Sequence, residues 1–312
     1  MIQDALQKVS ADRIRRDLFY LCRDPLLFRK ANYTRPGQSV DSLAEADAYI
    51  HGQLESAGYD VVTTRHRVQA FRCDKTKQPP NQWFSPPQPE DPWYDAANLE
   101  ATRVGRAHPE EIIQLISHKD SMSWIDSPGA HDNGTGTVAN LEVARILAGC
   151  DLKRSVRVLF CNEEHWPWTS RFAAEAAAAR GDRLIAVLNV DGVDSKSDEM
   201  MAAGKLIHAI GYSTDEGRPL AEFIAGCAAR YRIGLEVRTF FKEHVNDDDG
   251  MYIKAGFRTT AMNTGGGGDK EYHLPGDIPE RVSLENVLRS TQLLLAAVLE
   301  IAEDGAEILR KT

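Results

Sequence analysis

Metal-binding residue types directly follow three apolar segments, each of the length of a β-strand. The segments and the polar residues after them are EIIQLIS (111–117) before His118 and Asp120, SVRVLFC (155–161) before Glu163 and Glu164, and LIAVLNV (184–190) before Asp191. In an open α/β sheet, ligands lie beyond the carboxyl ends of the strands. Three neighbouring parallel strands would therefore bring a histidine and several carboxylates to one place, which suits a metallohydrolase.

Each of these polar residues has a chemical reason to lie beside a cation. Glu163 and Glu164 are adjacent carboxylates, which repel each other unless positive charge neutralises them. One of the pair can bind a metal while the other takes the proton of an attacking water. Asp191 follows a fully apolar strand, so its burial requires a partner such as a metal. His118 can bind metal through one ring nitrogen while Asp120 orients the ring.

A glycine-rich segment, PGAHDNGTG (128–136), stands directly before an expected helix. Its glycines allow the backbone to pass close to a ligand. Asp132 in this segment has two interpretations: a cap for the first N–H groups of the helix, or a carboxylate that bridges two metals. His273, in YHLPGD (272–277), is a further candidate ligand. A lone histidine in a loop is usually structural or exposed, so His273 is a candidate only because the other metal-binding residue types are present.

The elements that must position these residues alternate between strand and helix from Asn98 onward. Helices are predicted by apolar spacing over 42–57, 135–148 and 171–181, from 220 and from 283, and Ser10 is expected to cap an earlier one. Such alternation is typical of an α/β domain. We therefore expect a single domain over residues 1–312, with a mixed, mostly parallel central sheet covered by helices on both faces.

A proline-rich loop, residues 79–97, lies before this alternation begins. It holds six prolines between residues 79 and 92, which is typical of a loop with polyproline character. The loop is interpreted as a surface excursion, as a wall of the active-site mouth or as a contact between subunits. The sequence leaves this open, and it leaves the oligomeric state open too, with a homo-oligomer among the options.

Composition argues against several classes of partner and location. The net charge is −9 at pH 7, whereas nucleic acids and anionic membranes attract a basic face. No apolar run is long enough to span a membrane, and the N-terminal residues lack the apolar core of a signal peptide. The five cysteines have no CxxC spacing and are expected to be free thiols. We therefore expect a cytoplasmic protein with no nucleic-acid or membrane partner.

Five motifs occur in the order HKD (118–120), GAHDNGTG (129–136), NEE (162–164), LNVD (188–191) and YHLPGD (272–277). Together they resemble the co-catalytic zinc aminopeptidases of metallopeptidase family 28, which also includes glutaminyl cyclases and glutamate carboxypeptidases. The resemblance runs from about Asn98 to Asp277. It implies a zinc-exopeptidase-like fold, a peptide or small amide as substrate, and removal of N-terminal residues as the activity.

The resemblance also implies a set of metal ligands. His118 and Asp191 would hold one zinc, Glu164 and His273 would hold the other, and Asp132 would bridge the two. Two zinc ions per chain are implied, although ligation rich in carboxylate oxygens also suits manganese or cobalt.

Two further residues receive catalytic roles from the same resemblance. Glu163 would be the general base that takes a proton from a metal-bridged water, and Asp120 would orient His118. In such a centre the metals polarise the scissile carbonyl and stabilise the oxyanion that forms from it.

Three departures from the family pattern mark candidate substrate-binding residues. His131 stands where the family usually has another acid. After the two glutamates the family usually has a small, glycine-containing turn, whereas this chain has Trp166 and Trp168. These rings could form a wall of the site or pack in the core. Asp248 and Asp249 stand where family members often carry an Asp-His pair; they could attract a substrate amine or cap a helix.

Three alternatives to an aminopeptidase remain at the sequence level. A glutaminyl-cyclase-like aminoacyltransferase needs a single zinc and no attacking water. A carboxypeptidase or amidase of the same family needs a basic pocket for the substrate carboxylate. A non-catalytic binding protein with the same fold is expected to have lost ligands, whereas every ligand position is filled here.

Overall fold

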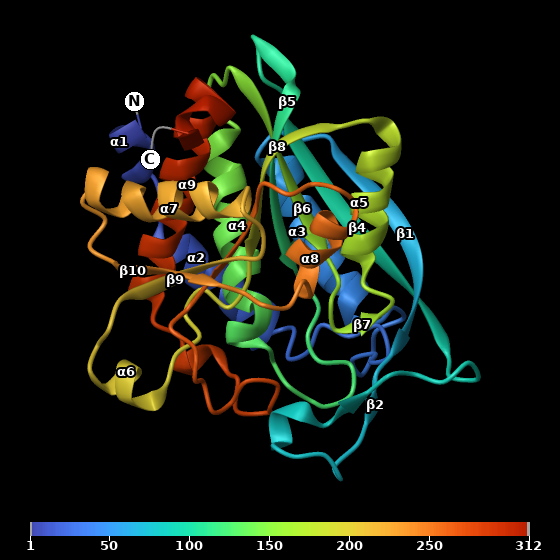
Figure 1. Cartoon of the computed structure of the whole chain (residues 1–312). Coiled ribbons are helices and arrows are strands. Elements are labelled where there is room, and N and C mark those ends of the chain that lie inside the picture. The colour runs from blue at the N-terminus through green and yellow to red at the C-terminus, as the bar shows by residue number, and fades with distance from the viewer. Residues whose placement is uncertain (1, 311–312) are drawn as a thin grey trace.

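A mixed β-sheet forms the centre of the molecule in a computed structural model that describes residues 2–310 (Figure 1). Within these residues the sheet has nine strands in the order β10-β9-β11-β8-β5-β6-β4-β1-β7, and β2 and β3 form a separate two-stranded sheet. The strands are β1 (Val61–Ala70), β2 (Arg72–Cys73), β3 (Phe84–Ser85), β4 (Trp93–Arg103), β5 (His108–His118), β6 (Arg154–Cys161), β7 (His165–Trp166), β8 (Arg183–Val190), β9 (Ile207–Tyr212), β10 (Glu236–Phe241) and β11 (Thr260–Thr264).

Parallel pairing is concentrated in the middle of this sheet. Strands β11, β8, β5 and β6 are parallel neighbours, and β10 pairs parallel with β9. On one side β6, β4, β1 and β7 pair antiparallel, and β11 pairs antiparallel with β9. The expected mixed sheet is confirmed, but the expectation that it is mostly parallel is wrong, because as many neighbouring strands pair antiparallel as parallel. Strands β1 and β4 pair antiparallel because a loop connects them, whereas parallel neighbours require a crossover connection, usually a helix.

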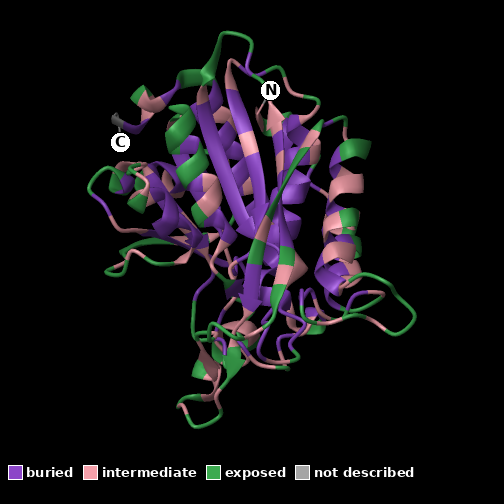
Figure 2. Cartoon of the chain, turned by 90° about the vertical axis from the view of Figure 1, so that its right-hand side faces the viewer, coloured by how far each residue is buried: buried purple, intermediate pink, exposed green. Residues whose placement is uncertain are grey.

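Helices cover both faces of the sheet, as expected. One face carries α2, α3, α4, α7 and α9 over the larger apolar core, and the other carries α5 and α8 over a smaller one (Figure 1). The central strands are accordingly buried along most of their length (Figure 2). The helices are α1 (Ile2–Leu6), α2 (Ala11–Cys22), α3 (Ser42–Ser56), α4 (Thr135–Leu147), α5 (Thr169–Arg180), α6 (Asp198–Ala202), α7 (Gly217–Arg230), α8 (Asp247–Lys254) and α9 (Leu284–Asp304).

The helix ends follow the chemistry of their capping residues. The Ser10 side chain accepts a hydrogen bond from the Arg13 N–H at the start of α2, and Ser283 does the same for the Asn286 N–H at the start of α9. Helix α5 ends before Gly181, whose φ of 72° lies in the left-handed region that glycine adopts without strain. The helix boundaries expected from the sequence are confirmed to within a few residues. None of the described helices combines the length and apolar character needed to cross a bilayer.

The four parallel central strands end at the same edge of the sheet. Strand β5 ends at His118, β6 at Cys161, β8 at Val190 and β11 at Thr264. The loops that follow them, together with the segment before α4, therefore share one side of the molecule. The proline-rich excursion, which we define as residues 71–92, projects on that side as well (cyan in Figure 1).

Candidate metal centre

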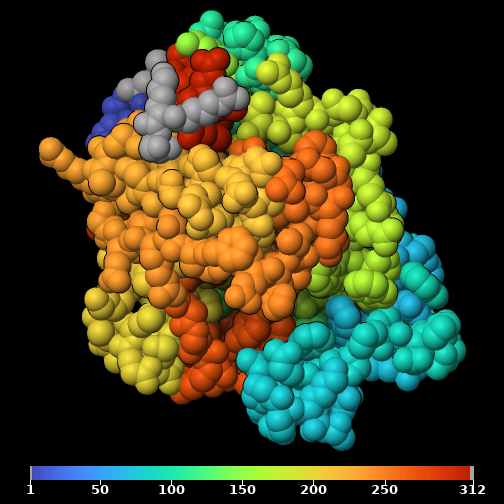
Figure 3. All heavy atoms as spheres, viewed as in Figure 1, coloured from blue at the N-terminus to red at the C-terminus, as the bar shows by residue number. Residues whose placement is uncertain are grey.

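The metal-binding residue types singled out in the sequence lie around one cavity of about 660 Å³. Its lining includes residues from the ends of β5, β6 and β8, from the segment before α4 and from the loop after β11: His118, Asp132, Glu163, Glu164, Asp191 and His273. Residues of the excursion also line the cavity, and Figure 3 shows the excursion (cyan) beside the orange and red-orange segments of the C-terminal part. The convergence expected from the strand order is therefore observed.

Asp132 lies between the two histidines of this group. Its Oδ1 atom is 3.1 Å from Nε2 of His118, which is also 3.5 Å from Oδ1 of Asp191. Its Oδ2 atom is 3.1 Å from Nε2 of His273, which is also 3.4 Å from Oε1 of Glu164. Each oxygen of one carboxylate thus faces a different pair made of one histidine and one acid.

The donor atoms fit divalent cations. Nitrogen and oxygen donors from His118, Asp132 and Glu164 approach within 4.8 Å of one another, as do those of His118, Glu163 and Asp191. Oδ2 of Asp132 is buried and close to His273 without hydrogen-bond geometry, so it has no hydrogen-bond partner among the described residues. A buried carboxylate oxygen without a donor is costly unless a cation accepts its charge.

The pKa shifts of the two glutamates also favour bound cations at this cavity. Burial, followed by the charges of Asp248 and Asp247, raises the pKa of Glu163 well above its usual value. Burial also raises the pKa of Glu164 to about 7, although the nearby His273 opposes this shift. These carboxyls are crowded together in a place where negative charge is poorly solvated. Divalent cations would relieve that crowding.

The two histidines supply part of the missing positive charge. Burial alone would lower the pKa of His118, but Asp120, Asp132 and Asp191 together raise it well above the usual value. His273 behaves in the same way: its pKa rises to about 10, because Glu164 and Asp132 outweigh the effect of burial. In a metal centre both rings must be neutral, so metal binding and proton release are coupled.

Residues 98–298 match the family model described as Peptidase family M28. The chain belongs to peptidase family M28. It is 26% identical over 224 residues to a probable aminopeptidase of Saccharomyces cerevisiae, covering 65% of this chain and 56% of that protein. It is also 26% identical over 199 residues to an aminopeptidase of Bacillus subtilis, covering 62% of this chain and 41% of that protein. The chain thus spans less than two thirds of the length of these two relatives.

Solved structures confirm the zinc-exopeptidase-like α/β fold of this M28 chain. The LapA aminopeptidase of Legionella pneumophila superimposes with a TM-score of 0.73 at 17% identity, over 97% of this chain and 75% of that one. A glutaminyl cyclase of Bacteroides thetaiotaomicron superimposes with a TM-score of 0.68 at 13% identity, over 93% of this chain and 98% of that one. At such low identities the likeness concerns the fold.

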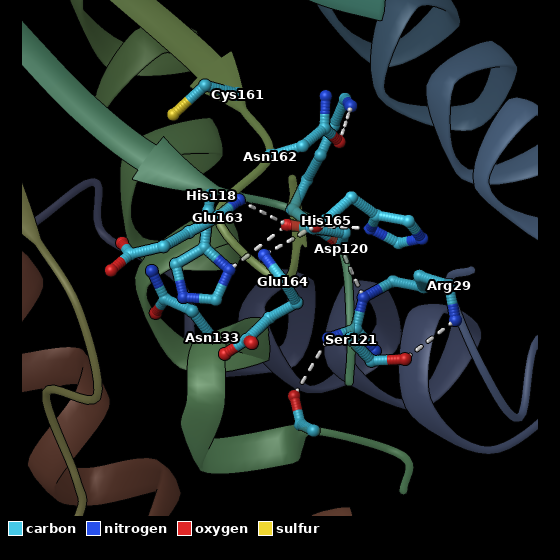
Figure 4. A network of polar contacts seen from close by, with 12 residues as sticks. Arg29, His118, Asp120, Ser121, Asn133, Cys161, Asn162, Glu163, Glu164 and His165 are labelled. Atoms are coloured by element: carbon cyan, nitrogen blue, oxygen red, sulfur yellow. Dashed lines mark hydrogen bonds and ion pairs between the residues drawn. The ribbon is translucent and has the colours of Figure 1, made fainter. Parts of the chain in front are cut away.

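Asp120 contacts the ring nitrogen of His118 that does not face Asp132 and Asp191. Its Oδ1 atom is 3.2 Å from Nδ1 of His118, and the same oxygen accepts a hydrogen bond from the Glu163 N–H at 3.0 Å. Its Oδ2 atom accepts one from the Glu164 N–H at 2.8 Å (Figure 4). Burial opposes ionisation of Asp120, but its histidine partners outweigh burial and lower its pKa. Asp120 is therefore an anion in contact with His118 and with the main chain of both glutamates.

The helix-cap interpretation of Asp132 is wrong, because its neighbour performs that task. Oδ1 of Asn133 accepts a hydrogen bond from the Gly136 N–H at 2.9 Å, in the first turn of α4. Gly136 has no room for a side chain: an added Cβ would lie 2.2 Å from Asn133 Oδ1 and 2.2 Å from the Val190 oxygen. The start of α4 therefore packs directly against the end of β8, and Asp132 stays free to face the cavity.

His273 is held by a residue that sequence reasoning missed. Its Nδ1 atom is 3.0 Å from the main-chain oxygen of Asn81, in the excursion. Its ring lies 5.5 Å from the ring of Phe84 and 5.1 Å from that of Trp124, centroid to centroid. A main-chain oxygen gives no sequence signal. The proline content marked the segment but did not show that it contacts a candidate ligand.

The candidate substrate-binding residues are placed unevenly. Trp168 lines the cavity, whereas Trp166 does not and is 45% exposed. Asp248 is buried against Sγ of Cys161 at 3.1 Å, and Asp249 pairs with Lys242. Asp247, which sequence reasoning did not single out, lines the cavity. Asp248 and Asp249 both lie in the acidic first turn of α8, as the helix-cap alternative expects, although neither forms a capping hydrogen bond with its side chain.

His131 is not among the residues that line the cavity. It is buried beside Asp277, whose Oδ1 atom lies 2.8 Å from the His131 Nδ1 atom. Asp194 and Asp269 also lie within 3.4 Å and 3.3 Å of its ring nitrogens. These carboxylates overcome burial and raise the pKa of His131 to about 10. A cationic His131 therefore ties the segment before α4 to two other loops, away from a substrate in the cavity.

Proposed function

We propose that this chain is a metal-dependent exopeptidase, an aminopeptidase that hydrolyses N-terminal peptide bonds with two divalent cations, zinc being the first choice. One observation carries the proposal: each oxygen of Asp132 faces its own pair of one histidine and one acid. That arrangement suits a carboxylate shared by two ions. Membership of family M28 and the similarity to proteins named aminopeptidases support the same activity.

The ligands divide naturally between two positions. His118 and Asp191 would hold one ion, Glu164 and His273 the other, and Asp132 would bridge them. When bound, such ions act as Lewis acids that lower the pKa of a water molecule and polarise the scissile carbonyl. The carboxylate-rich donor set also accepts manganese or cobalt.

Glu163 is the proposed general base. Its Oε2 atom is buried and has no hydrogen-bond partner among the described residues, so it is available to a reactant. In the proposed step Glu163 takes a proton from the attacking water as the oxygen bonds to the carbonyl carbon. It then passes that proton to the leaving amine nitrogen as the C–N bond breaks. A raised pKa suits a group that must both accept and return a proton.

The charge of the cavity favours an amino terminus as the recognised end of the substrate. Besides the proposed ligands and Glu163, the lining carries the carboxylates of Asp247 and Asp269, which pair with Lys242 and Arg281, and neither of these cations is among the lining residues. Such a surface attracts an ammonium group and repels a carboxylate. An aminopeptidase is therefore favoured over a carboxypeptidase of the same family.

The deciding experiment is digestion of a mixed peptide pool by the zinc-loaded chain, followed by mass spectrometry. Stepwise loss of N-terminal residues is the expected result, and metal analysis should give two zinc ions per chain. Loss of ammonia from N-terminal glutamine, together with one zinc, would identify a glutaminyl cyclase instead. Intact peptides with metal bound would contradict the proposal and would point to a small amide substrate or a binding role.

A further inference from the structure

His165 is a buried histidine that the proposed mechanism does not use. It follows Glu164 directly and lies in the short strand β7, where it pairs with Ala70 at the end of β1. Its Nδ1 atom is 2.7 Å from Oδ2 of Asp120, and its Nε2 atom is 3.2 Å from the main-chain nitrogen of Ala31. Both ring nitrogens therefore have a partner in the protein.

The partners of the ring determine where its hydrogen lies. A main-chain N–H can only donate, so the Ala31 N–H requires a lone pair on Nε2 of His165. In a neutral imidazole the other nitrogen then carries the hydrogen. Nδ1–H of His165 consequently donates to Oδ2 of Asp120. A single tautomer satisfies both contacts.

This donation completes the hydrogen bonding of Asp120. Oδ1 faces Nδ1 of His118 and accepts from the Glu163 N–H, while Oδ2 accepts from the Glu164 N–H and from His165. A carboxylate has about four lone-pair positions, and each now has a donor. His118 and His165 lie on opposite sides of Asp120 (Figure 4). The orientation of Asp120 is thus fixed from both sides.

We propose that His165 is a positioning residue for the metal centre. By donating to Asp120 it holds that carboxylate in the orientation that accepts Nδ1–H of His118. Nε2 of His118 then keeps its lone pair toward Asp132 and Asp191. The same carboxylate fixes the main chain of Glu163 and Glu164. The inference rests on the proposed metal centre, but not on peptides being the substrate.

Two substitutions separate this role from simple packing. His165→Phe keeps a ring of similar size but removes the donor to Asp120 and the acceptor for the Ala31 N–H. His165→Gln retains an N–H donor and an oxygen acceptor on one side chain. The chain of 312 residues is stripped of metal, and cobalt and zinc binding are then followed by calorimetry and by the visible absorption of cobalt. Thermal unfolding of each metal-free variant shows whether it folds.

His165→Phe should weaken binding at the position held by His118 about 10- to 100-fold, the range found when partners behind metal ligands are lost. It should lower kcat more than it raises KM, and His165→Gln should recover most of both losses. Wild-type metal affinity in a folded Phe variant would overturn the proposal. Gln behaving no better than Phe would overturn it as well.

A measurement on the wild-type chain covers the case in which the Phe variant fails to fold. Nitrogen-15 NMR of the imidazoles distinguishes the two neutral tautomers, and His165 should carry its hydrogen on Nδ1. A hydrogen on Nε2 would contradict the proposal, because Asp120 would then lack this donor. If the wild type binds metal but cleaves no peptide, the proposed activity fails while the metal titrations still test His165.

Discussion

Nδ1 of His273 lies 3.0 Å from the main-chain oxygen of Asn81, so the proline-rich excursion is bonded to a proposed metal ligand. Phe84 from the same excursion lies with its ring 5.0 Å from that of Trp124, and both line the cavity. Of the roles considered from the sequence, the structure therefore supports a wall of the site within the same chain. That wall is aromatic where it meets His273.

Removing the aromatic wall should weaken substrate binding. We expect Phe84→Ala to raise KM about tenfold for peptides with a large apolar first residue, because a buried apolar contact in a pocket contributes about 1–3 kcal/mol. Steady-state kinetics on a peptide series checks this. Trp93→Ala is the matched control, since Trp93 is 46% exposed and does not line the cavity. Equal KM values in both variants would show that Phe84 does not contact substrate.

Removing the proposed general base should stop turnover without releasing metal. Glu163→Gln keeps the size of the side chain but cannot accept a proton from water. We expect kcat to fall about 10²- to 10⁴-fold, the usual contribution of general base catalysis. Metal content should stay at the wild-type level, because Glu163 is not among the five proposed ligands. Full activity in this variant would rule out the proposed role.

Removing the metals should make the chain less stable. The cavity concentrates carboxylates, and Oδ2 of Asp132 has no hydrogen-bond partner among the described residues. Ions bound only by the folded state stabilise it by about 4 kcal/mol at a thousand times Kd. We therefore expect chelator treatment to lower Tm by several degrees and zinc to restore it. A Tm unaffected by chelation, with metal loss verified, would argue against a metal centre at these residues.

His208 should make stability depend on pH on the acid side. It is buried between the Ser290 hydroxyl and the Asn263 side chain, and burial lowers its pKa to about 4 from an ordinary 6.5. The unfolded chain therefore binds a proton between these values that the folded chain excludes. The stabilising contribution is complete above pH 6.5 and is lost as the pH falls toward 4.

From pH 7 to pH 5 this single group should reduce the free energy of unfolding by about 2 kcal/mol. Denaturant unfolding of the metal-free chain measures the effect without interference from metal binding. His208→Gln should lose overall stability but show a flatter pH dependence. Parallel curves for the variant and the wild type would mean that His208 is protonated in the folded chain.

Gly136 should not tolerate alanine, although it lies in a helix. Alanine usually stabilises a helix by about 0.5–1 kcal/mol relative to glycine. Here the added carbon would meet Asn133 Oδ1 and the Val190 oxygen at 2.2 Å, so we expect a loss of about 1–3 kcal/mol or more. Gly52→Ala in α3 is the control, because its Cβ would meet nothing within 4 Å and should stabilise. Unfolding curves of both variants test the contrast.

Much of the site could be predicted because strand ends are visible in sequence. Three apolar runs before His118, Glu163 and Asp191 indicate neighbouring strands, and parallel strands bring their carboxyl ends together. The convergence follows from backbone geometry and does not depend on details of packing. The central parallel strands and the helix limits were predictable for the same reason, since both reflect periodic patterns and caps.

Contacts between distant segments could not be predicted in this way. Three aspartates from two loops surround His131: Asp194 follows β8, and Asp269 and Asp277 follow β11. No local pattern links these positions. The main-chain atoms of Asn81 and Ala31 leave no signature at all, because every residue carries the same groups. His165 was not singled out from the sequence, because a lone histidine beside the two glutamates does not show which residue it contacts.

Arg29, in the N-terminal third of the chain, forms hydrogen bonds with segments near the proposed metal ligands. Its guanidinium is fully buried and donates to the main-chain oxygens of Lys119 at 2.7 Å, Pro128 at 2.6 Å and Gly129 at 2.8 Å. It therefore fastens the segment after β5 to the segment that carries Asp132. Arg29 lies outside the stretch that matches the M28 family.

A shortened chain beginning at residue 98 would contain every proposed metal ligand and still lack Arg29. Its two ligand-bearing segments would keep their sequence but lose the cation that joins their carbonyl groups. The match to the family therefore omits a residue that joins two segments on which the proposed metal ligands lie.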